Sequence, residues 1–167
     1  MNLEQCIDYI HSKFRKGSIP GLHRMAELLE MLGNPHQELK YVHIAGTNGK
    51  GSTASMTASI LEKAGYKTGL YTSPHIYRFH ERIRVNGVDI SDEDLSAITE
   101  YVKPLAQAMA DHPTEFELVF CIAIEYFKRV GCDIVVLEVG MGGALDSTNV
   151  IDPPEAAVIT NIGLDHT

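Results

Sequence analysis

The sequence predicts an α/β fold in which a mainly parallel sheet is flanked by helices and carries a P-loop-like phosphate-binding turn. Three observations predict it. Short apolar segments typical of buried strands alternate with longer amphipathic segments. A glycine-rich turn, residues 46–52, joins the first of these strands to a helix. A second strand follows that helix, and a strand–helix–strand unit places its two strands parallel in one sheet.

The composition fits a globular protein. The 167 residues suffice for one domain or a large part of one. Apolar residues make up 44% of the chain and charged residues 22%, which excludes collagen-like and disordered classes. Fourteen basic against 22 acidic residues give a net charge of -8, so we expect no broad nucleic-acid surface. No apolar run has the length of a membrane helix, so we expect no membrane partner.

The cysteines and the amino-terminal residues indicate a cytoplasmic protein. Cys6, Cys121 and Cys132 form no CxxC pair, and each is expected to be a small apolar core residue in a reducing compartment. No basic segment precedes an apolar one near residue 1, so no secretory signal is expected. His75 and His80 lack the spacing of zinc ligands, and we expect no zinc site.

The expected elements follow from periodicity and caps. Apolar spacing predicts helices over residues 3–14 and 22–32, and a third helix after the glycine-rich turn with Ala54, Thr57, Ile60, Leu61 and Ala64 on one side. Strands are expected over residues 41–45, 67–72, 133–139 and 156–160.

Turn and capping signals predict three further elements. The dipeptide Asn86-Gly87 predicts a hairpin between residues 81–85 and 88–90. A helix is expected over residues 91–110, kinked or broken at Pro104. A capping box opens the next helix. The two capping residues are Thr114 and Glu117. The core face of this helix is expected to include Phe116, Val119, Phe120, Ala123, Ile124 and Phe127.

The turn GTNGKGST, residues 46–53, is the first candidate site. It follows a strand and opens a helix, so successive backbone N–H groups can point at a phosphate. Lys50 supplies a positive charge for the β- and γ-phosphates, and Ser52 or Thr53 a hydroxyl for Mg²⁺. A strict Walker A motif would need glycine at the position of Ile44. The alternative interpretation is an ordinary glycine-rich turn.

Polar side chains follow three other strands. Glu138 ends an apolar strand beside a glycine-rich turn, which suits a carboxylate that coordinates Mg²⁺. Ser73 offers a hard oxygen ligand after another strand, and His166 follows the last one. Because the carboxyl ends of parallel strands share one edge, these residues are expected to converge. Taken singly, each has an ordinary alternative: a solvated carboxylate, a Ser-Pro turn and a surface histidine.

Eight segments in the same order carry a family resemblance. They are residues 21–25 (GLHRM), 43–53 (HIAGTNGKGST), 69–75 (GLYTSPH), 81–84 (ERIR), 114–117 (TEFE), 138–143 (EVGMGG), 145–149 (LDSTN) and 159–166 (ITNIGLDH). Across nearly the whole chain these segments resemble the N-terminal part of folylpolyglutamate synthases, including the bifunctional dihydrofolate synthase form. These enzymes are the folate branch of the Mur-type amide ligases.

The resemblance implies roles for individual residues. The implied ATP contacts are Asn48, Gly49, Lys50, Gly51, Ser52 and Thr53. The implied magnesium ligands are Ser73, Glu138 and His166, and the implied catalytic residues are Lys50, Glu138 and His166. The implied contacts to the pterin substrate are Ser18, Ile19, Pro20, Arg82, Thr114, Glu115, Phe116, Glu117, Leu145, Asp146 and Ser147. Thr114 and Glu117 thus have two interpretations, as a helix cap and as substrate contacts.

The resemblance also implies a fold type, a reaction and partners. Residues 1–167 match the N-terminal part of a Mur-type ATP-binding domain, without the rest of that domain and without a C-terminal glutamate-binding domain. The implied enzyme uses ATP and Mg²⁺ to join L-glutamate to a reduced folate or to dihydropteroate through an acyl phosphate. The chain alone is not expected to form the amide bond. No nucleic-acid partner is implied.

Three alternatives remain at this point. A related Mur-type ligase would act on a cell-wall precursor, although the segments around Tyr71 and Thr114 favour the folate branch. A P-loop module could bind nucleotide without catalysis. An interaction domain would not be stabilised by Mg-ATP at all.

Overall fold

The computed structural model describes residues 1–14 and 21–163. Its centre is a six-stranded sheet in the order β4-β3-β2-β5-β1-β6. The strands are β1 (Tyr41–Ala45), β2 (Thr68–Tyr71), β3 (Ile83–Val85), β4 (Val88–Asp89), β5 (Ile134–Glu138) and β6 (Ala156–Ile159). The strands β2, β5, β1 and β6 are parallel, and β3 and β4 are antiparallel. The predicted mainly parallel sheet is therefore confirmed.

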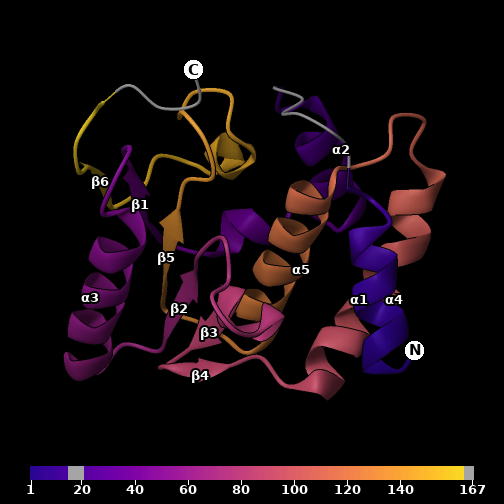
Figure 1. Ribbon diagram of the computed structural model, residues 1–167, viewed down its shortest axis with the longest axis horizontal. Helices are drawn as coiled ribbons and strands as arrows, with labels where there is room; N and C mark the ends of the chain where they lie inside the picture. The colour runs from indigo at the N-terminus through magenta and orange to yellow at the C-terminus, as the bar shows by residue number, and fades with distance from the viewer. Residues whose placement is uncertain (15–20, 164–167) are drawn as a thin grey trace.

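Strand β5 lies between β1 and β2, so the first strand–helix–strand unit spans a third strand. The register sets Ile44 of β1 opposite Glu138 of β5, and Tyr71 of β2 opposite Leu137. The four parallel strands thus end at one edge of the sheet, which is the upper edge in Figure 1. Loops that follow these strands meet there, as the sequence predicts.

In the described residues, five α-helices flank the sheet. They are α1 (Leu3–His11), α2 (His23–Met31), α3 (Lys50–Lys63), α4 (Asp92–Ala108) and α5 (Glu115–Arg129), and short 3₁₀ turns lie at η1 (Pro35–Glu38), η2 (Phe79–Arg82) and η3 (Ser147–Val150). Helix α3 covers one face of the sheet, and α5 covers the other (Figure 1). Helices α1 and α4 pack on the side of α5 away from the sheet.

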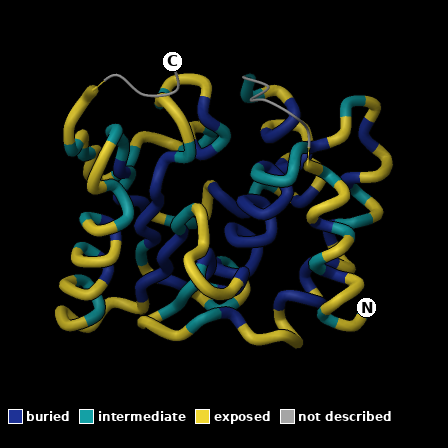
Figure 2. The backbone as a smooth tube through the Cα atoms, viewed as in Figure 1, coloured by how far each residue is buried: buried dark blue, intermediate teal, exposed yellow. Residues whose placement is uncertain are grey.

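Helix α5 is buried along its middle on every side. All residues from Glu117 to Phe127 are buried, as the dark tube in Figure 2 shows. The prediction of a single core face is therefore too narrow, because α5 lies between the sheet and an outer layer of helices. Phe116, included in that face, is only partly buried.

Helix α3 packs through small residues. Ala54 and Ala58 are buried against Ile44 and Val136, which form a second, smaller core cluster. Ile60, expected on the packing side, is 69% exposed. That expectation is wrong because the side of α3 that approaches the sheet is set by its alanines.

The predicted hairpin turn is confirmed, whereas the predicted interruption of α4 is not. Asn86 and Gly87 have positive φ values of 48° and 73°, as a two-residue hairpin turn requires, and they join the antiparallel β3 and β4. Of the kink or break expected at Pro104, the break is wrong, since α4 continues through Pro104 to Ala108. All three cysteines are buried and unpaired, as predicted. No helix in the described part of the chain is long and apolar enough to cross a membrane.

Candidate functional site

The candidate phosphate-binding turn, residues 46–53, is called the phosphate loop below. It begins directly after β1 and runs into the first turn of α3. Gly49 has a φ of 80° and is the residue before the first turn of α3. The N–H groups of Lys50, Gly51 and Ser52 occupy that first turn, where a helix offers them no carbonyl partner. The helix dipole adds positive potential at the same point. The local structure is therefore suited to an anion such as phosphate.

The Lys50 side chain lies back over this loop. Its ammonium group donates to the carbonyl oxygens of Gly46 at 2.9 Å and Thr47 at 3.1 Å. Two backbone carbonyls satisfy the ammonium only in part, since it has three donors. The charge therefore lies at the loop and remains able to bind an added phosphate oxygen.

Glu138 lies next to the first turn of α3. Its side chain is buried, and its Oε2 accepts a hydrogen bond of 3.0 Å from the Ser73 N–H. A Cβ at Gly51 would lie 3.4 Å from the same oxygen, so helix and carboxylate are in contact. Burial raises the pKa of the Glu138 carboxyl above its usual range, while the Ser73 N–H and the Lys50 charge oppose that rise.

The chemistry of these groups fits a hard divalent cation. A buried carboxylate whose charged form is disfavoured gains from a cation beside it, and Glu138 has this environment. The Ser73 backbone contact puts the Ser73 residue next to that carboxylate. Within residues 1–14 and 21–163 no group of three His, Cys, Asp or Glu side chains converges. The third expected ligand, His166, lies outside the described residues.

The loop after β6 holds the phosphate loop, which sequence reasoning missed. Asn161 accepts from the N–H groups of Thr47 and Asn48, and the Thr160 hydroxyl donates to the Asn48 carbonyl. The signal was the position of the segment TNIG directly after a parallel strand. The structure thus joins the loops of β1 and β6, as the convergence argument predicts for this edge.

Two expected substrate residues have structural roles. Thr114 and Glu117 form the predicted capping box: the Thr114 N–H donates to Glu117 at 2.7 Å, and the Glu117 N–H donates to the Thr114 hydroxyl at 3.3 Å. The buried Glu117 carboxylate also pairs with Arg24, whose Nε lies 3.0 Å from both oxygens. Together these contacts occupy the carboxylate and secure the amino end of α5.

Phe116, Glu115 and Arg82 line the neighbouring rim. The Phe116 ring packs edge-on against Tyr71 at 6.0 Å and covers Gly140, where a Cβ would lie 2.6 Å from the ring. The Glu115 carboxylate lies 3.7 Å from an Arg82 nitrogen. The Arg82 Nε is buried and has no partner among the described residues. Burial raises the pKa of Tyr71 to about 12, despite the opposing Arg82 charge.

Asp146 organises the loop after β5. Its carboxylate accepts from the N–H groups of Met141 at 2.8 Å and Thr148 at 3.0 Å, and the Thr148 hydroxyl bonds to His43 at 2.8 Å. Burial lowers the pKa of His43, which keeps that ring neutral near pH 7. The next expected residues differ in exposure: Leu145 is 61% exposed, and Ser147 is partly buried.

The described site residues therefore form two neighbouring groups at one edge of the sheet. The expected nucleotide and metal residues gather at the amino end of α3, and the expected substrate residues gather at the amino end of α5 and in the loop after β5. Ser52 and Thr53 lie in the first turns of α3, as expected. The predictions for Ser18, Ile19 and Pro20 lie outside the described residues.

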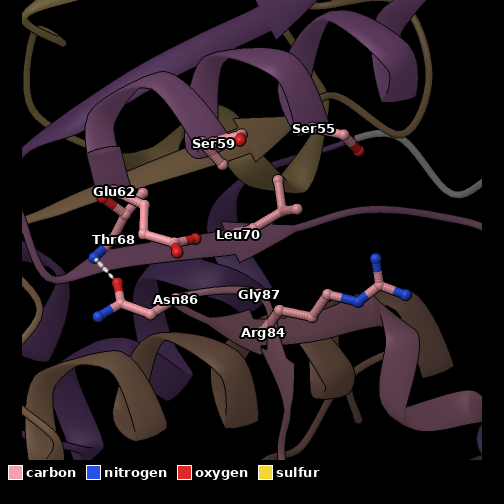
Figure 3. A pocket seen from close by; sticks show the side chains of 9 residues that line it. Ser55, Ser59, Glu62, Thr68, Leu70, Arg84, Asn86 and Gly87 are labelled. Atoms are coloured by element: carbon pink, nitrogen blue, oxygen red, sulfur yellow. Dashed lines mark hydrogen bonds between the residues drawn. The ribbon is translucent and has the colours of Figure 1, made fainter. Parts of the chain in front are cut away.

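A groove between α3 and the β3–β4 hairpin is separate from this edge. Figure 3 shows its lining from Ser55, Ser59 and Glu62 on α3 to Arg84 and Asn86 on the hairpin side. The Asn86 side chain accepts from the Thr68 N–H at 2.8 Å, which ties the turn to β2. None of the expected site residues lines the groove.

Comparison with known proteins shows the family to which this fold belongs. Residues 44–167 match the Mur ligase middle domain. The match covers well over half of the chain, and the chain belongs to this family. The Mur-type fold that the sequence predicts is therefore confirmed.

Individual relatives are more specific. The chain is 45% identical over 163 residues to a Bacillus subtilis protein named dihydrofolate synthase/folylpolyglutamate synthase, covering 95% of this chain and 38% of that one. A solved FPGS–AMPPCP–folate complex is 43% identical with a TM-score of 0.94, covering 100% of this chain and 42% of that one. Escherichia coli FolC in complex with DHPP and ADP is 37% identical with a TM-score of 0.90, covering 100% and 40%.

These relatives are much longer than the chain. The chain spans about two fifths of the length of the relatives that it matches. The likeness extends along essentially all of the chain, so the whole described fold has a counterpart in them.

Proposed function

We propose that the chain is the nucleotide-binding part of an ATP-dependent amide ligase that adds L-glutamate to a folate or to dihydropteroate. The observation that supports it most directly is the contact between the first turn of α3 and the buried Glu138 carboxylate, with the Lys50 ammonium beside them. Backbone N–H donors for a phosphate, the Lys50 ammonium and the Glu138 carboxylate then lie close together.

The loop residues bind and orient the nucleotide phosphates in this proposal. The N–H groups of Lys50, Gly51 and Ser52 donate to phosphate oxygens, and the Lys50 ammonium does the same with the donor that its two loop carbonyls leave unused. Asn48, Gly49 and Thr53 complete the loop. Ser73 and Glu138 would hold Mg²⁺, with His166 as the third expected ligand; the ion supplies charge neutralisation at the phosphates.

The proposed reaction joins two anions before it forms an amide. The acceptor carboxylate attacks the γ-phosphate, ADP leaves, and the amine of L-glutamate then displaces phosphate from the acyl phosphate. Attack of one anion on another needs positive charge and alignment, which is the role assigned to Lys50. The acceptor is proposed to lie against Phe116, Arg82, Glu115 and residues 145–147.

The names of the relatives favour a folate acceptor over a cell-wall precursor. Of the two solved complexes named above, one contains folate and the other contains DHPP. We propose that residues 1–167 form the N-terminal part of a Mur-type ATP-binding domain, that L-glutamate binds outside these residues, and that the protein acts in the cytoplasm. By itself the chain is then a nucleotide-binding module without ligase activity.

Calorimetric titration with Mg-ATP tests the phosphate assignment. We expect Lys50→Ala to weaken binding about 10- to 100-fold, since a hydrogen bond to a charged group contributes about 1.5–3 kcal/mol. Lys63→Ala is the matched control, because Lys63 ends the same helix and its side chain is 81% exposed. A folded Lys50→Ala protein with wild-type affinity would refute the assignment.

The acceptor class is tested separately by binding. Titration of the chain with dihydropteroate, tetrahydrofolate and a cell-wall precursor in the presence of Mg-ATP compares the candidates directly. We expect a pterin compound to bind and the precursor not to bind. Binding of the precursor alone would favour the cell-wall ligase alternative.

A further inference from the structure

The loop after β6 contacts the phosphate loop through three backbone groups of Thr47 and Asn48 and through the Thr47 hydroxyl, which accepts from the Gly163 N–H at 3.0 Å. The Thr47 N–H donates to the Asn161 carbonyl at 2.8 Å, and the Asn48 N–H donates to Asn161 Oδ1 at 2.9 Å. The Thr160 hydroxyl donates to the Asn48 carbonyl at 2.7 Å and also lies 3.4 Å from the Ala45 carbonyl. Asn48 is thus held through both its N–H and its C=O.

Gly46 makes this contact possible. Its φ is +134°, and a Cβ at this position would overlap the Thr160 hydroxyl and lie 2.9 Å from the Asn161 carbonyl oxygen. The first glycine of the loop is therefore explained by the close approach of residues 160–161. This explanation for a glycine at position 46 does not require a bound phosphate.

The hydrogen bonds to Asn161 determine which backbone N–H groups of the phosphate loop remain free to bind a ligand. Asn161 already uses the N–H groups of Thr47 and Asn48. The N–H groups of the first turn of α3, from Lys50 to Ser52, have no such partner in the helix. A phosphate at this loop would therefore be bound through the first turn of α3, beyond the braced segment.

We propose that Thr160 and Asn161 are positioning residues that fix the phosphate loop before nucleotide binds. They hold Asn48 in place, and Gly49, at a φ of 80°, then directs the chain into the first turn of α3. This inference rests on the proposed nucleotide function. A loop fixed in advance loses less conformational freedom when ligand binds, so affinity depends on these two residues although they do not touch the nucleotide.

Hydrogen exchange in the nucleotide-free chain tests the bracing directly. In wild-type protein the amide of Asn48 is expected to be protected, and Asn161→Ala is expected to speed its exchange at least about 10-fold by removing the acceptor. The Thr47 amide, whose acceptor is a backbone carbonyl, should respond less. Equal exchange of the Asn48 amide in wild type and variant would overturn the inference.

Nucleotide affinity provides the second readout. Thr160→Val has the same shape without the hydroxyl, and loss of one neutral hydrogen bond predicts Mg-ATP binding about 5-fold weaker. Thr160→Ser keeps the hydroxyl and should restore most of the affinity. Thr57→Val, two turns along α3, makes the same chemical change away from the loop. Wild-type affinity in Thr160→Val, or an equal loss in Thr160→Ser, would contradict a role for the hydroxyl.

The two experiments separate this inference from the proposed function. A wild-type chain that binds no Mg-ATP refutes the proposed function, whatever the exchange data show. Exchange of the Asn48 amide that responds to Asn161→Ala supports the bracing of the loop in either case. Nucleotide binding together with an Asn48 amide that does not respond would support the function and refute the bracing.

Discussion

The Glu138 carboxylate is buried at the end of β5, and burial raises its pKa above the usual range. The folded chain therefore holds a proton on this group more tightly than the unfolded chain does. The ionised form costs stability at any pH above the folded pKa, and the cost fades as the pH falls toward the unfolded value near 4.5. A cation at this carboxylate would remove that cost.

We therefore predict that Glu138→Gln stabilises the ligand-free chain. The amide is nearly isosteric and avoids burial of a charge, so the melting temperature at pH 8 should rise by about 2–4 °C for each kcal/mol recovered. The gain should shrink as the pH is lowered toward 5. The same variant should lose the stabilisation that Mg²⁺ adds to nucleotide binding, because a neutral amide is a poor ligand for a hard cation.

Thermal melts at several pH values, with and without Mg-ATP, measure both effects. Glu155→Gln is the control, since Glu155 is an exposed glutamate and its replacement should change neither. A lower melting temperature for Glu138→Gln at pH 8 would show that the charge itself stabilises the fold.

The role of a single residue could be predicted where neighbouring residues in the sequence form a recognisable pattern. Lys50 and Glu138 each stand beside a glycine-rich turn at the end of an apolar segment, which is a local signal. The partners of Glu117 and Asn48 could not be predicted. Arg24 is 93 positions away from Glu117, and Asn161 is 113 positions away from Asn48, and no local pattern joins such residues.

Among the elements, α5 combines the core with the rim of the candidate site. Its amino end carries the capping box of Thr114 and Glu117 and the ion pair between Glu117 and Arg24. Both members of that pair are almost fully buried, with side-chain exposures of 2% and 1%. A buried pair is weak evidence of net stabilisation, but removal of one charge leaves the other in an apolar environment.

We predict that Glu117→Gln destabilises the chain by about 3 kcal/mol, and lowers the melting temperature by roughly 6–12 °C. The glutamine keeps a hydrogen-bond acceptor for the Thr114 N–H, so the loss reports mainly the charge opposite Arg24. Denaturant unfolding measures it. Glu115→Gln, two residues earlier and more exposed, is the control and should cost much less; equal losses would show that the ion pair is not the cause.

The elements themselves were predictable to different degrees. The hairpin at Asn86-Gly87 and the start of α5 follow from turn and cap chemistry within four residues. The insertion of β5 between β1 and β2 depends on contacts far apart in sequence, which no pattern in the chain specifies. Ile60 shows the same limit, because an apolar side chain is buried only where another element covers it.

At the scale of the whole molecule, β6 is an edge of the sheet. It pairs with β1 on one side, and within residues 1–14 and 21–163 no strand lies on its other side. Ala156, Ala157 and Ile159 are exposed, and β6 contains neither proline nor charge. Such an edge is able to pair with another strand, and native proteins usually blunt it.

We predict that the purified chain associates through this edge as its concentration rises. Ile159→Lys should reduce the associated fraction, because a charge on an edge strand disfavours pairing. Sedimentation velocity over a range of concentrations measures the effect. Ile60→Lys is the control: its side chain is similarly exposed, at 69% against 65%, but lies on a helix. An equal effect of both variants would assign the association to apolar surface in general.

The brace across the phosphate loop has a consequence for the order of synthesis. The Asn161 side chain that holds Asn48 is synthesised 113 residues after Asn48 itself. At about 5–20 residues per second, this interval lasts roughly 6–23 s. During that time β1 and α3 exist without the segment that orders the turn between them. The proposed nucleotide site is therefore completed only after most of the described hydrophobic core has been synthesised.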